Sequence, residues 1–366
     1  MGNVPNLRFP EFSGEWVTKS INDLAVVIGG GTPDTTVKSY WDGEIQWFTP
    51  SEIGKNKYVD SSLRTITEVG LNNSSAKLLP PNTILLSSRA TIGECSLSLR
   101  ECATNQGFQS LVSKKCNVDF LYYLIQTKKK DLIRKSCGST FLEISANEVR
   151  KIQVSVPSDV EQQKIAELLS LIDERIATQN KIIEKLQSLI KGLAVALTTK
   201  EKANIAISQC LECHSSTLQE SEVLSSGLCK VFGANGLVGY KDVPQMNGDA
   251  ILVIKDGSGV GTVSYAQGKF SVIGTLNYLT VIGNNDLRYL YFALSVFNFQ
   301  PYKTGMAIPH IYFKDYGKAK IYCPSLAEQK RVANVLDKLE SKLFVEQELL
   351  ASFNQQKLYL LGKMFI

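Results

Sequence analysis

Two short segments carry residue types that are common in metal and cofactor sites, but neither has the surroundings that such chemistry requires. Cys-Leu-Glu-Cys-His at 210–214 has the spacing of a haem attachment site. It lies in a polar, serine-rich stretch, and no second pair of ligands at zinc spacing accompanies it. Gly-Ser-Gly-Val-Gly at 257–261 resembles a phosphate-binding loop, but strand-like residues follow where a helix would have to begin. We expect a linker at the first segment, a hairpin turn at the second, and no metal site.

Residues for nucleophilic or acid–base catalysis are equally sparse. The chain contains two histidines, His214 and His310, and neither lies near the nucleophile turn that a Ser-His-Asp or Cys-His site uses. The glycine run at 29–31 lacks the lysine of a P-loop, and Leu-Pro-Pro-Asn at 79–82 does not match the Asn/Asp-Pro-Pro-aromatic loop of an amino-methyltransferase. We therefore predict a chain without catalysis or a cofactor of its own.

Polar and basic side chains on predicted loops offer a different chemistry, the recognition of nucleic acid. Arg and Lys can read guanine, Asn and Gln can read adenine, and Ser, Thr and Lys can hold phosphates. Any one of these side chains could instead lie in a solvated loop, and the basic run at 128–135 faces either a phosphate backbone or only solvent. The candidates for DNA contact are Gln46, Thr49, Ser51, Lys55, Asn56, Lys57, Ser88, Arg89 and Thr91 in the first half of the chain, and Lys230, Asn235, Lys241, Lys255, Ser258 and Lys303 in the second.

An internal repeat organises the elements that must position these loops. The segment VPSDVEQQKIAELLSLID begins at Val156, and CPSLAEQKRVANVLDKLE begins at Cys323, an offset of 167 positions. The match continues without a gap back to the pair Gly138 and Gly305. An internal period this long indicates a duplicated half rather than a solenoid.

Each copy of the repeat predicts a long helix with a coiled-coil seam. Apolar residues recur at alternating spacings of three and four, and a single amphipathic core helix would explain a few turns of this pattern but not its length. Gln179 and Glu346 interrupt the two seams at equivalent places, and would meet near the crossing point of an antiparallel pair, where a polar layer can fix the register. The seams comprise Ile165, Leu169, Ile172, Ile176, Gln179, Ile183 and Leu186, and Leu336, Leu339, Leu343, Glu346, Leu350 and Phe353.

The rest of the chain reads as two globular parts. Strand-like runs at 23–28, 83–87 and 108–112 and a helix-like run at 119–130 recur in shortened form after residue 226. We predict an α+β fold in which two globular domains, 1–157 and 199–324, are separated by two long antiparallel coiled-coil helices, 158–198 and 325–366. The internal repeat implies a pseudo-twofold relation between the halves.

Composition sets the broad class. The 366 residues are 44% hydrophobic and 20% charged, as is ordinary for a soluble globular protein. No apolar run approaches the ~18 residues of a membrane span, and the N-terminus lacks the pattern of a secretory signal. The eight cysteines are scattered, which favours a reducing cytoplasm. The net charge of +5 permits a nucleic-acid partner without requiring one.

The order of the parts and several short motifs resemble the specificity (S) subunit of type I restriction-modification enzymes. The motifs are LRFPEFSGEW from Leu7, TNQGFQSLV from Thr104, GANGLVGY from Gly233 and IPHIYFKDYGK from Ile308. The resemblance implies that each globular part is a target recognition domain that reads one half of a bipartite double-stranded DNA site. It also implies that the paired helices set the gap between the half-sites.

The resemblance implies partners as well. Two methyltransferase subunits would dock on the framework and two restriction (motor-nuclease) subunits could join them, with S-adenosylmethionine, ATP and Mg bound in those partners and adenine as the methylated base. Candidates for the docking face are Glu161, Gln162, Glu328 and Gln329, at the starts of the two helices. Two alternatives remain open: a specificity subunit of a methyltransferase-only system, and a coiled-coil scaffold that binds only protein.

One departure concerns the transfer of contacts from one half to the other. The first half has Phe-Leu-Glu-Ile at 141–144 where the second has the more family-like Ile-Pro-His-Ile at 308–311. The two globular parts therefore differ in side-chain chemistry at this place, and contacts do not transfer residue by residue from one half to the other.

Overall fold

The computed structural model describes residues 2–138, 142–305 and 307–366. It divides into two compact units: unit 1 comprises Met1–Gln179 and Leu349–Ile366, and unit 2 comprises Asn180–Glu348. The divisions fall inside the two long helices, α6 (Asp159–Thr198) and α9 (Leu326–Met364). Each unit therefore contains one globular part and one portion of each long helix.

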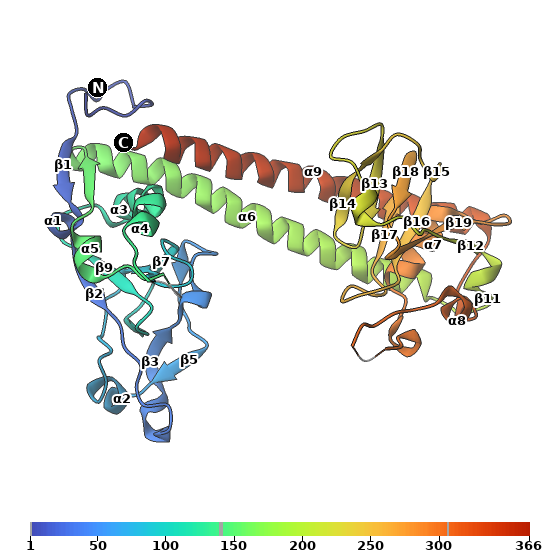
Figure 1. Ribbon diagram of the computed structural model, residues 1–366, viewed down its shortest axis with the longest axis horizontal. Coiled ribbons are helices and arrows are strands. Elements are labelled where there is room, and N and C mark those ends of the chain that lie inside the picture. The colour runs from blue at the N-terminus through green and yellow to red at the C-terminus, as the bar shows by residue number, and fades with distance from the viewer. Residues whose placement is uncertain (1, 139–141, 306) are drawn as a thin grey trace. The chain divides into compact units, whose positions relative to one another are not determined.

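Two sheets build the globular part of unit 1, and a third pairing joins its ends (Figure 1). The larger sheet has the strand order β2-β9-β6-β7-β4 and the smaller one β5-β3-β8. Strand β1 pairs antiparallel with β10, with Val17 opposite Val156, which brings the beginning and the end of the globular part together where α6 starts. The strands are β1 (Val17–Ser20), β2 (Ala25–Gly29), β3 (Trp41–Phe48), β4 (Tyr58–Val59), β5 (Arg64–Ile66), β6 (Ile84–Leu86), β7 (Cys95–Ser98), β8 (Cys102–Thr104), β9 (Gln109–Ser113) and β10 (Gln153–Val156).

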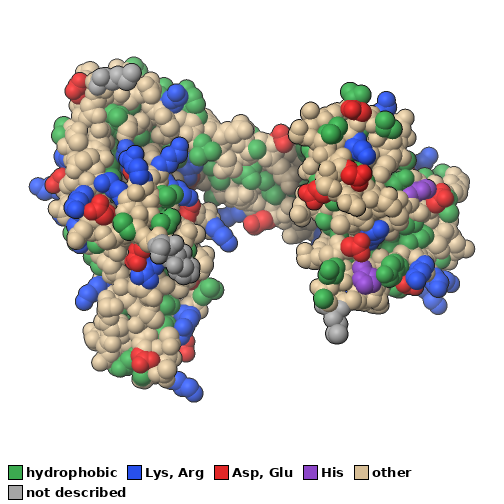
Figure 2. All heavy atoms as spheres, viewed as in Figure 1, with side chains coloured by type: hydrophobic (Ala, Val, Ile, Leu, Met, Phe, Trp, Pro, Cys, Tyr) green, Lys and Arg blue, Asp and Glu red, His purple; other side chains and the backbone are tan. Residues whose placement is uncertain are grey.

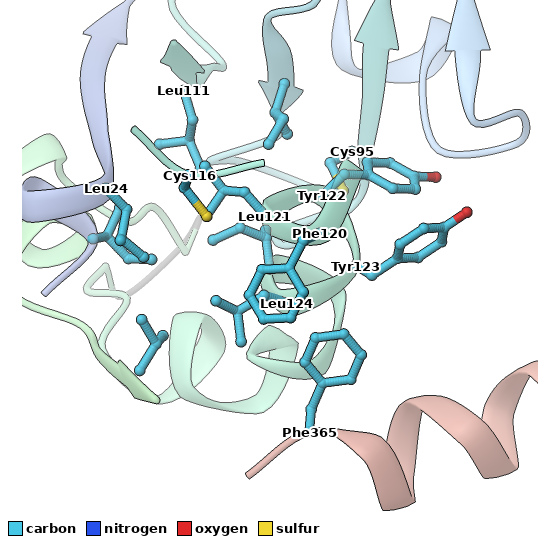
Figure 3. Packing of buried hydrophobic residues seen from close by; sticks show 14 of the residues in the cluster. Leu24, Cys95, Leu111, Cys116, Phe120, Leu121, Tyr122, Tyr123, Leu124 and Phe365 are labelled. Carbon is cyan, nitrogen blue, oxygen red and sulfur yellow. The ribbon is translucent and has the colours of Figure 1, made fainter. Parts of the chain in front are cut away.

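The core of unit 1 lies between its sheet, the helix α3 (Val118–Thr127) and the long helices. Asn117 caps α3 by accepting a hydrogen bond from the Phe120 amide at 2.9 Å. Six consecutive residues of α3 are buried, which is possible because the helix is covered on several sides. Phe365, just beyond the end of α9, packs against Phe120 with the ring centroids 5.3 Å apart (Figure 3).

Unit 2 has two four-stranded sheets and a two-stranded pairing, β11–β20. The sheet orders are β12-β19-β16-β17 and β14-β13-β18-β15. The strands are β11 (Ile205–Ala206), β12 (Leu211–Ser215), β13 (Cys229–Gly233), β14 (Gly236–Lys241), β15 (Met246–Asn247), β16 (Ala250–Ile254), β17 (Val263–Ala266), β18 (Lys269–Val272), β19 (Leu276–Val281) and β20 (Lys320–Ile321). Its principal globular helix, α7 (Leu287–Ser295), is capped by Asp286 as α3 is by Asn117.

The two units share one sheet topology. The order β2-β9-β6-β7 of unit 1 corresponds to β12-β19-β16-β17 of unit 2, and β5-β3-β8 corresponds to β14-β13-β18. In both smaller sheets the first pairing is antiparallel and the second parallel. The duplication that the sequence predicted for the helices and, in shortened form, for the globular parts is confirmed.

The two predicted seams differ in burial: most of the α6 seam is buried, with Ile176 and Leu186 half-buried, whereas in α9 Leu336 is buried and the other seam residues are half-buried. In unit 1 the early residues of α6 pack with the last turns of α9 in one core, and the Lys357 ammonium lies 2.7 Å from the Asp173 carboxylate. In unit 2 the last turns of α6 pack with the first turns of α9. The two helices are therefore antiparallel in each unit, as predicted. The predicted meeting of Gln179 with Glu346 stays a prediction, because the two residues belong to different units.

Short helical turns complete the described chain. None of its helices combines the length and the apolar character that a membrane crossing requires. The turns are α1 (Ile21–Leu24), α2 (Glu68–Asn72), α4 (Lys129–Arg134), α5 (Ala146–Arg150), α8 (Phe313–Tyr316) and the 3-10 helices η1 (Lys38–Tyr40), η2 (Pro50–Glu52), η3 (Ile207–Gln209), η4 (Glu220–Glu222) and η5 (Gln300–Tyr302).

Candidate nucleic-acid interface

The candidates at the end of β3 divide into structural and exposed side chains. Gln46 Oε1 accepts hydrogen bonds from the Ser62 amide and hydroxyl at 2.7 and 3.1 Å. Thr49 donates to the Glu52 carboxylate at 2.7 Å as part of the cap of η2. These two side chains are half-buried and hold the loop in shape, whereas those of Ser51, Lys55 and Asn56 are exposed on it. DNA contact at this loop stays a prediction for the three exposed residues.

Lys57 is not available to DNA, which corrects its assignment as a contact residue. Its side chain is 6% exposed, and its ammonium lies 2.6 Å from the Asp119 carboxylate. It also donates to Ser170 Oγ of α6 at 2.7 Å and lies 4.9 Å from the ring centroid of Tyr123. A desolvated ammonium needs such partners. Lys57 therefore joins the globular part of unit 1 to the long helix.

The loop between β6 and β7 holds three candidates in different environments. Ser88 is fully buried, and its hydroxyl has no hydrogen-bond partner among the described residues. Arg89 is half-buried, and its guanidinium lies 2.9 Å from the Glu143 carboxylate. Thr91 is exposed and donates to Ser87 Oγ at 3.1 Å. Burial rules out a direct base contact by Ser88 in this conformation, while Arg89 and Thr91 stay at the surface.

In unit 2 the candidates form two groups. Lys230, Asn235 and Lys241 belong to the hairpin of β13 and β14. Lys255 and Ser258 belong to the turn between β16 and β17, the hairpin turn that the glycine spacing predicted, and Lys303 lines a hollow of 380 Å³ with Gly261 and Phe299. Of these, Lys255 and Ser258 occupy the place in unit 2 that the loop between β6 and β7 occupies in unit 1.

The segment around Cys210 is not the linker that its polar composition predicted. It enters strand β12, which pairs with β19 over five residues, from Leu211 opposite Val281 to Ser215 opposite Asn277. The sheet engages the histidine, since His214 Nε2 lies 2.9 Å from Thr280 Oγ1 and the His214 ring stacks on Tyr278. Among the described residues no group of three or more His, Cys, Asp and Glu side chains is placed to hold a metal ion.

A basic surface flanks the loop that carries Arg89. From the sequence, this basic segment could contact a phosphate backbone or face only solvent. Residues 128–135, which form α4 and its flanks, carry five cations and one carboxylate. Lys129 packs against Gly93 at the end of the loop. Burial lowers the pKa of Lys128, whose ammonium donates to the main-chain carbonyl of Ile366. Lys and Arg side chains gather on the face of unit 1 shown in Figure 2.

Two of the predicted docking residues lie inside unit 1. Glu161 is 1% exposed, and the Arg8 guanidinium donates two hydrogen bonds of 2.7 Å to its carboxylate. This bond raises the pKa of Arg8 above its ordinary value. Gln162 is also buried, accepts from the Asn117 amide at 3.1 Å and donates to the Pro157 carbonyl at 3.0 Å. Both side chains fix the globular part to the start of α6 and present no surface to a partner.

The equivalent docking candidates in unit 2, Glu328 and Gln329, differ in burial. Gln329 is buried, accepts from the Asp286 amide at 2.8 Å and donates to the Pro324 carbonyl at 2.9 Å. Glu328 is half-buried and lies 3.7 Å from Arg331 on the next turn of α9. Of the four predicted docking residues, only Glu328 keeps a side chain that a partner could touch.

The sequence interpretation missed Glu143 and His310 as members of these sites. Each forms isolated β-bridges to two segments of its unit, and they stand at the offset of the repeat. That offset is the signal that could have found them, although the surrounding residues differ. Phe141, the first residue of the departing segment, lies outside the described residues.

Comparison with known proteins supports a single family. The model of the type I restriction modification DNA specificity domain matches residues 13–188 and 214–355. The MjaIX specificity subunit of Methanocaldococcus jannaschii is 40% identical over 180 residues, which cover 47% of this chain and 42% of that protein. The EcoprrI specificity subunit of Escherichia coli is 25% identical over 345 residues, covering 85% of this chain and 84% of that one.

A solved structure agrees in fold. The S subunit of a type I restriction-modification system from M. genitalium superposes with a TM-score of 0.66 over 99% of both chains, at 19% sequence identity. The family match covers both halves of the chain, each with the same strand order. This chain therefore belongs to the family of type I restriction-modification DNA specificity domains and carries two copies of the domain.

Proposed function

We propose that this chain is the sequence-reading, non-catalytic subunit of a type I restriction-modification complex. Each globular part reads one half of a bipartite double-stranded DNA site. The long helices hold the two readers and serve as the framework for partner subunits. The observation that carries the proposal is the duplicated domain: the same strand order supports different exposed side chains at equivalent loops.

The duplication suits DNA because the duplex presents related surfaces at intervals of about one turn, ~34 Å, to a protein with a twofold arrangement. Arg and Lys supply the positioning contacts to phosphates, and the loops supply base contacts. The unlike loops of the two domains imply two unlike half-sites. The chain's modest net charge of +5 implies that partners share the phosphate contacts.

Catalysis belongs to partners in this proposal. The framework would take two methyltransferase subunits, which bind S-adenosylmethionine, and two restriction subunits, which bind ATP and Mg. The docking face would have to avoid Glu161, Gln162 and Gln329, whose side chains are buried within the chain. The complex would act where cellular DNA is accessible, in the cytoplasm.

Methylation-aware long-read sequencing tests the proposal. DNA would be taken from cells that express this chain together with its neighbouring methyltransferase. We expect a split methylated motif with two unlike halves and a fixed gap. A continuous motif would refute the assignment of one reader to each half-site. An assembled complex that yields no motif would favour a scaffold that binds only protein.

A four-residue insertion in α6 tests the framework. It adds about one helical turn, ~6 Å at ~1.5 Å per residue. The accepted gap between half-sites should change while both half-site sequences stay the same. An unchanged gap would show that the helices do not set the spacing.

A further inference from the structure

The loops that join β6 to β7 and β16 to β17 are anchored by the same pattern of isolated β-bridges. In each unit one residue bridges to the loop on one side and to a second segment on the other. All three positions differ by the repeat offset of 167. We call each set a bridge triplet; the triplets are Arg89, Glu143 and Cys137 in unit 1 and Asp256, His310 and Thr304 in unit 2.

The backbone around the two triplets is also equivalent. The Ile144 amide donates to the Ser88 carbonyl at 3.1 Å, and the Ile311 amide donates to the Lys255 carbonyl at 2.9 Å. The residue that follows each loop member of the triplet has positive φ, +55° at Ala90 and +97° at Gly257. An L-residue rarely adopts this conformation, so Ala90 retains it only because the surrounding loop imposes it. The loop therefore holds Arg89 in a defined place.

The chemistry of the two triplets is reversed although the backbone is the same. Unit 1 places an arginine on the loop and a carboxylate opposite, whereas unit 2 places Asp256 on the loop and His310 opposite. Because the bridges use only main-chain groups, the reversed polarity is not required by the shared backbone. It is expected where two copies of one domain recognise different ligands.

Each triplet leaves hydrogen-bonding capacity at the surface. The ion pair of Arg89 with Glu143 has side chains 43% and 38% exposed, so water screens it and it is easily exchanged. The Arg89 Nε group is buried and has no hydrogen-bond partner among the described residues, so the exposed capacity of this side chain lies at its terminal guanidinium nitrogens. In unit 2 His310 Nδ1 lies 3.2 Å from the Ile308 carbonyl. A carbonyl only accepts, so this contact requires the tautomer with the proton on Nδ1, in which Nε2 is an acceptor.

A hollow adjoins the loop in each unit. In unit 1 it measures 580 Å³ and is lined by Thr91, Lys129, Ile133 and Leu142. Ile133 and Leu142 are exposed apolar side chains beside the cations of α4. Apolar contacts of this kind suit a thymine methyl group, and the cations suit phosphates. The hollow of unit 2 lies at the equivalent place, since Gln300 lines it at the offset of Ile133.

We propose that the bridge triplets are base-reading positions of opposite character, which rests on the function proposed above. Arg89 donates to guanine O6 and N7 in the half-site of unit 1. Asp256 accepts from an exocyclic amino group, that of cytosine, in the half-site of unit 2, with His310 beside it as a second acceptor. The basic segment at α4 holds the phosphates next to the base that Arg89 reads.

The test compares methylated motifs of complexes assembled from this chain and its methyltransferase partner. Arg89→Gln should relax one position of one half-site, with discrimination there falling about tenfold or more, and leave the other half-site unchanged. Asp256→Asn should do the same in the other half-site. The double variant Arg89→Asp/Glu143→His transfers the chemistry of unit 2 to unit 1 and should replace a guanine preference by a cytosine preference.

Arg100→Ala is the matched control, because Arg100 forms an exposed ion pair with Asp60 in the same unit, at 2.7 Å. It should leave both half-sites as they are. If a variant modifies too weakly to map, competition binding with duplexes changed at single positions replaces the sequencing. Loss of discrimination at one position supports the proposal, and equal weakening at every position overturns it.

An unchanged motif in both triplet variants also overturns the proposal while the proposed function stands. A wild-type complex without a split motif is a different failure, since it removes the proposed function itself. Co-purification of the methyltransferase and an unchanged melting temperature identify variants that are folded and assembled.

Discussion

The two units use one helix position, occupied by equivalent carboxylates, to hold their globular parts in different ways. In unit 1 the Asp173 carboxylate accepts from the Tyr123 hydroxyl at 2.7 Å and pairs with Lys357, which belongs to α9. In unit 2 the Glu340 carboxylate accepts from the Tyr291 hydroxyl at 2.8 Å and pairs with Arg288 of α7. The carboxylate of unit 1 therefore ties three elements together, and that of unit 2 ties two.

The glutamines at the helix starts show no such difference. Gln162 and Gln329 each accept from the main-chain amide at the helix cap of α3 or α7 and donate to the proline carbonyl before the long helix. A buried amide must satisfy all of these groups at once, so few replacements fit. The comparison teaches that the duplicated domain keeps the glutamine contact at the start of each long helix, whereas the ion pairs around that junction differ between the units.

The largest expected effect is at the buried ion pair between Arg8 and Glu161, whose counterpart in unit 2 is exposed. Arg8→Ala leaves the carboxylate of Glu161, whose side chain is 2% exposed, without its cation. We expect the free energy of unfolding of unit 1 to fall by about 3 kcal/mol, since an uncompensated buried charge is costly. All three tryptophans, Trp16, Trp41 and Trp47, belong to unit 1. Urea unfolding followed by tryptophan fluorescence therefore measures this unit.

The matched control lies at the equivalent position of unit 2. Arg331→Ala removes the cation next to Glu328. That ion pair is exposed, and Arg331 Nη1 lies 3.7 Å from Glu328 Oε2. Its removal should change the free energy of unfolding by less than about 0.5 kcal/mol. Urea unfolding followed by circular dichroism measures this change. Equal losses in the two variants would contradict the distinction between the junctions.

A smaller effect on stability should distinguish Lys57 from Lys55, two lysines of the same loop. Lys57→Ala removes the ammonium held by Asp119, Ser170 and Tyr123, and should lower the free energy of unfolding of unit 1 by about 2 kcal/mol. Lys55→Ala changes an exposed side chain and should leave stability unchanged. If Lys55 contacts a phosphate, the slope of log affinity against log salt concentration should fall by about one in that variant only. A stable Lys57→Ala with a reduced slope would reverse the two roles.

The long helices and the strand order were predictable from the sequence to different extents. The seam from Ile165 to Leu186 was predictable because each residue repeats the same requirement, burial on one side of a helix. The duplicated sheet order was visible only as isolated strand-like runs. Its pairing depends on contacts between residues far apart in the chain, such as Ile84 with Leu111, that no local pattern contains.

The site residues were less predictable, because exposure is decided by distant partners. Lys57 looks like its neighbour Lys55 in the sequence, but Asp119 and Ser170 enclose only Lys57. Glu161 looks like a surface glutamate at a helix start, and Arg8 makes it internal. Glu143 and His310 occupy equivalent main-chain positions although their side chains differ, because a β-bridge places no demand on the side chain.

Alkaline pH should reveal a further difference between the units. Burial raises the pKa of Cys95, Cys102 and Cys116 in unit 1 to about 12, and that of Cys213 in unit 2 to about 11. Below ~8.5 both folded and unfolded thiols are protonated and stability does not change. Above it only the unfolded state releases protons, so each thiol lowers the free energy of unfolding by about 1.4 kcal/mol per pH unit until its folded pKa is reached.

Urea midpoints of tryptophan fluorescence at pH 7.5, 8.5 and 9.5 measure this slope for unit 1. Cys102→Ala should lower stability at every pH but flatten the slope by one thiol's share. A slope that does not differ between this variant and the wild type would show that these thiols do not control the alkaline response.

The smallest effect is a change in rate at the bridge triplets. Cys137 is exposed, whereas Cys95, Cys102 and Cys116 are buried, so iodoacetamide should modify Cys137 before the other three thiols of unit 1 at neutral pH. In the complex with the methyltransferase, a duplex that carries the recognised site should slow this reaction several-fold. An unrelated duplex of equal length should slow it less, because only the specific complex holds a base against the triplet.

Thr304→Cys places a thiol at the matching position of unit 2 and extends the comparison to the second half-site. A duplex with only the first half-site intact should protect Cys137 and leave the new thiol reactive, and the converse duplex should reverse the pattern. Protection of both thiols by either half-site alone would mean that the units do not divide the site between them. Protection of neither would place the DNA away from both triplets, and the reversed polarity of Arg89 and Asp256 would then need another ligand to explain it.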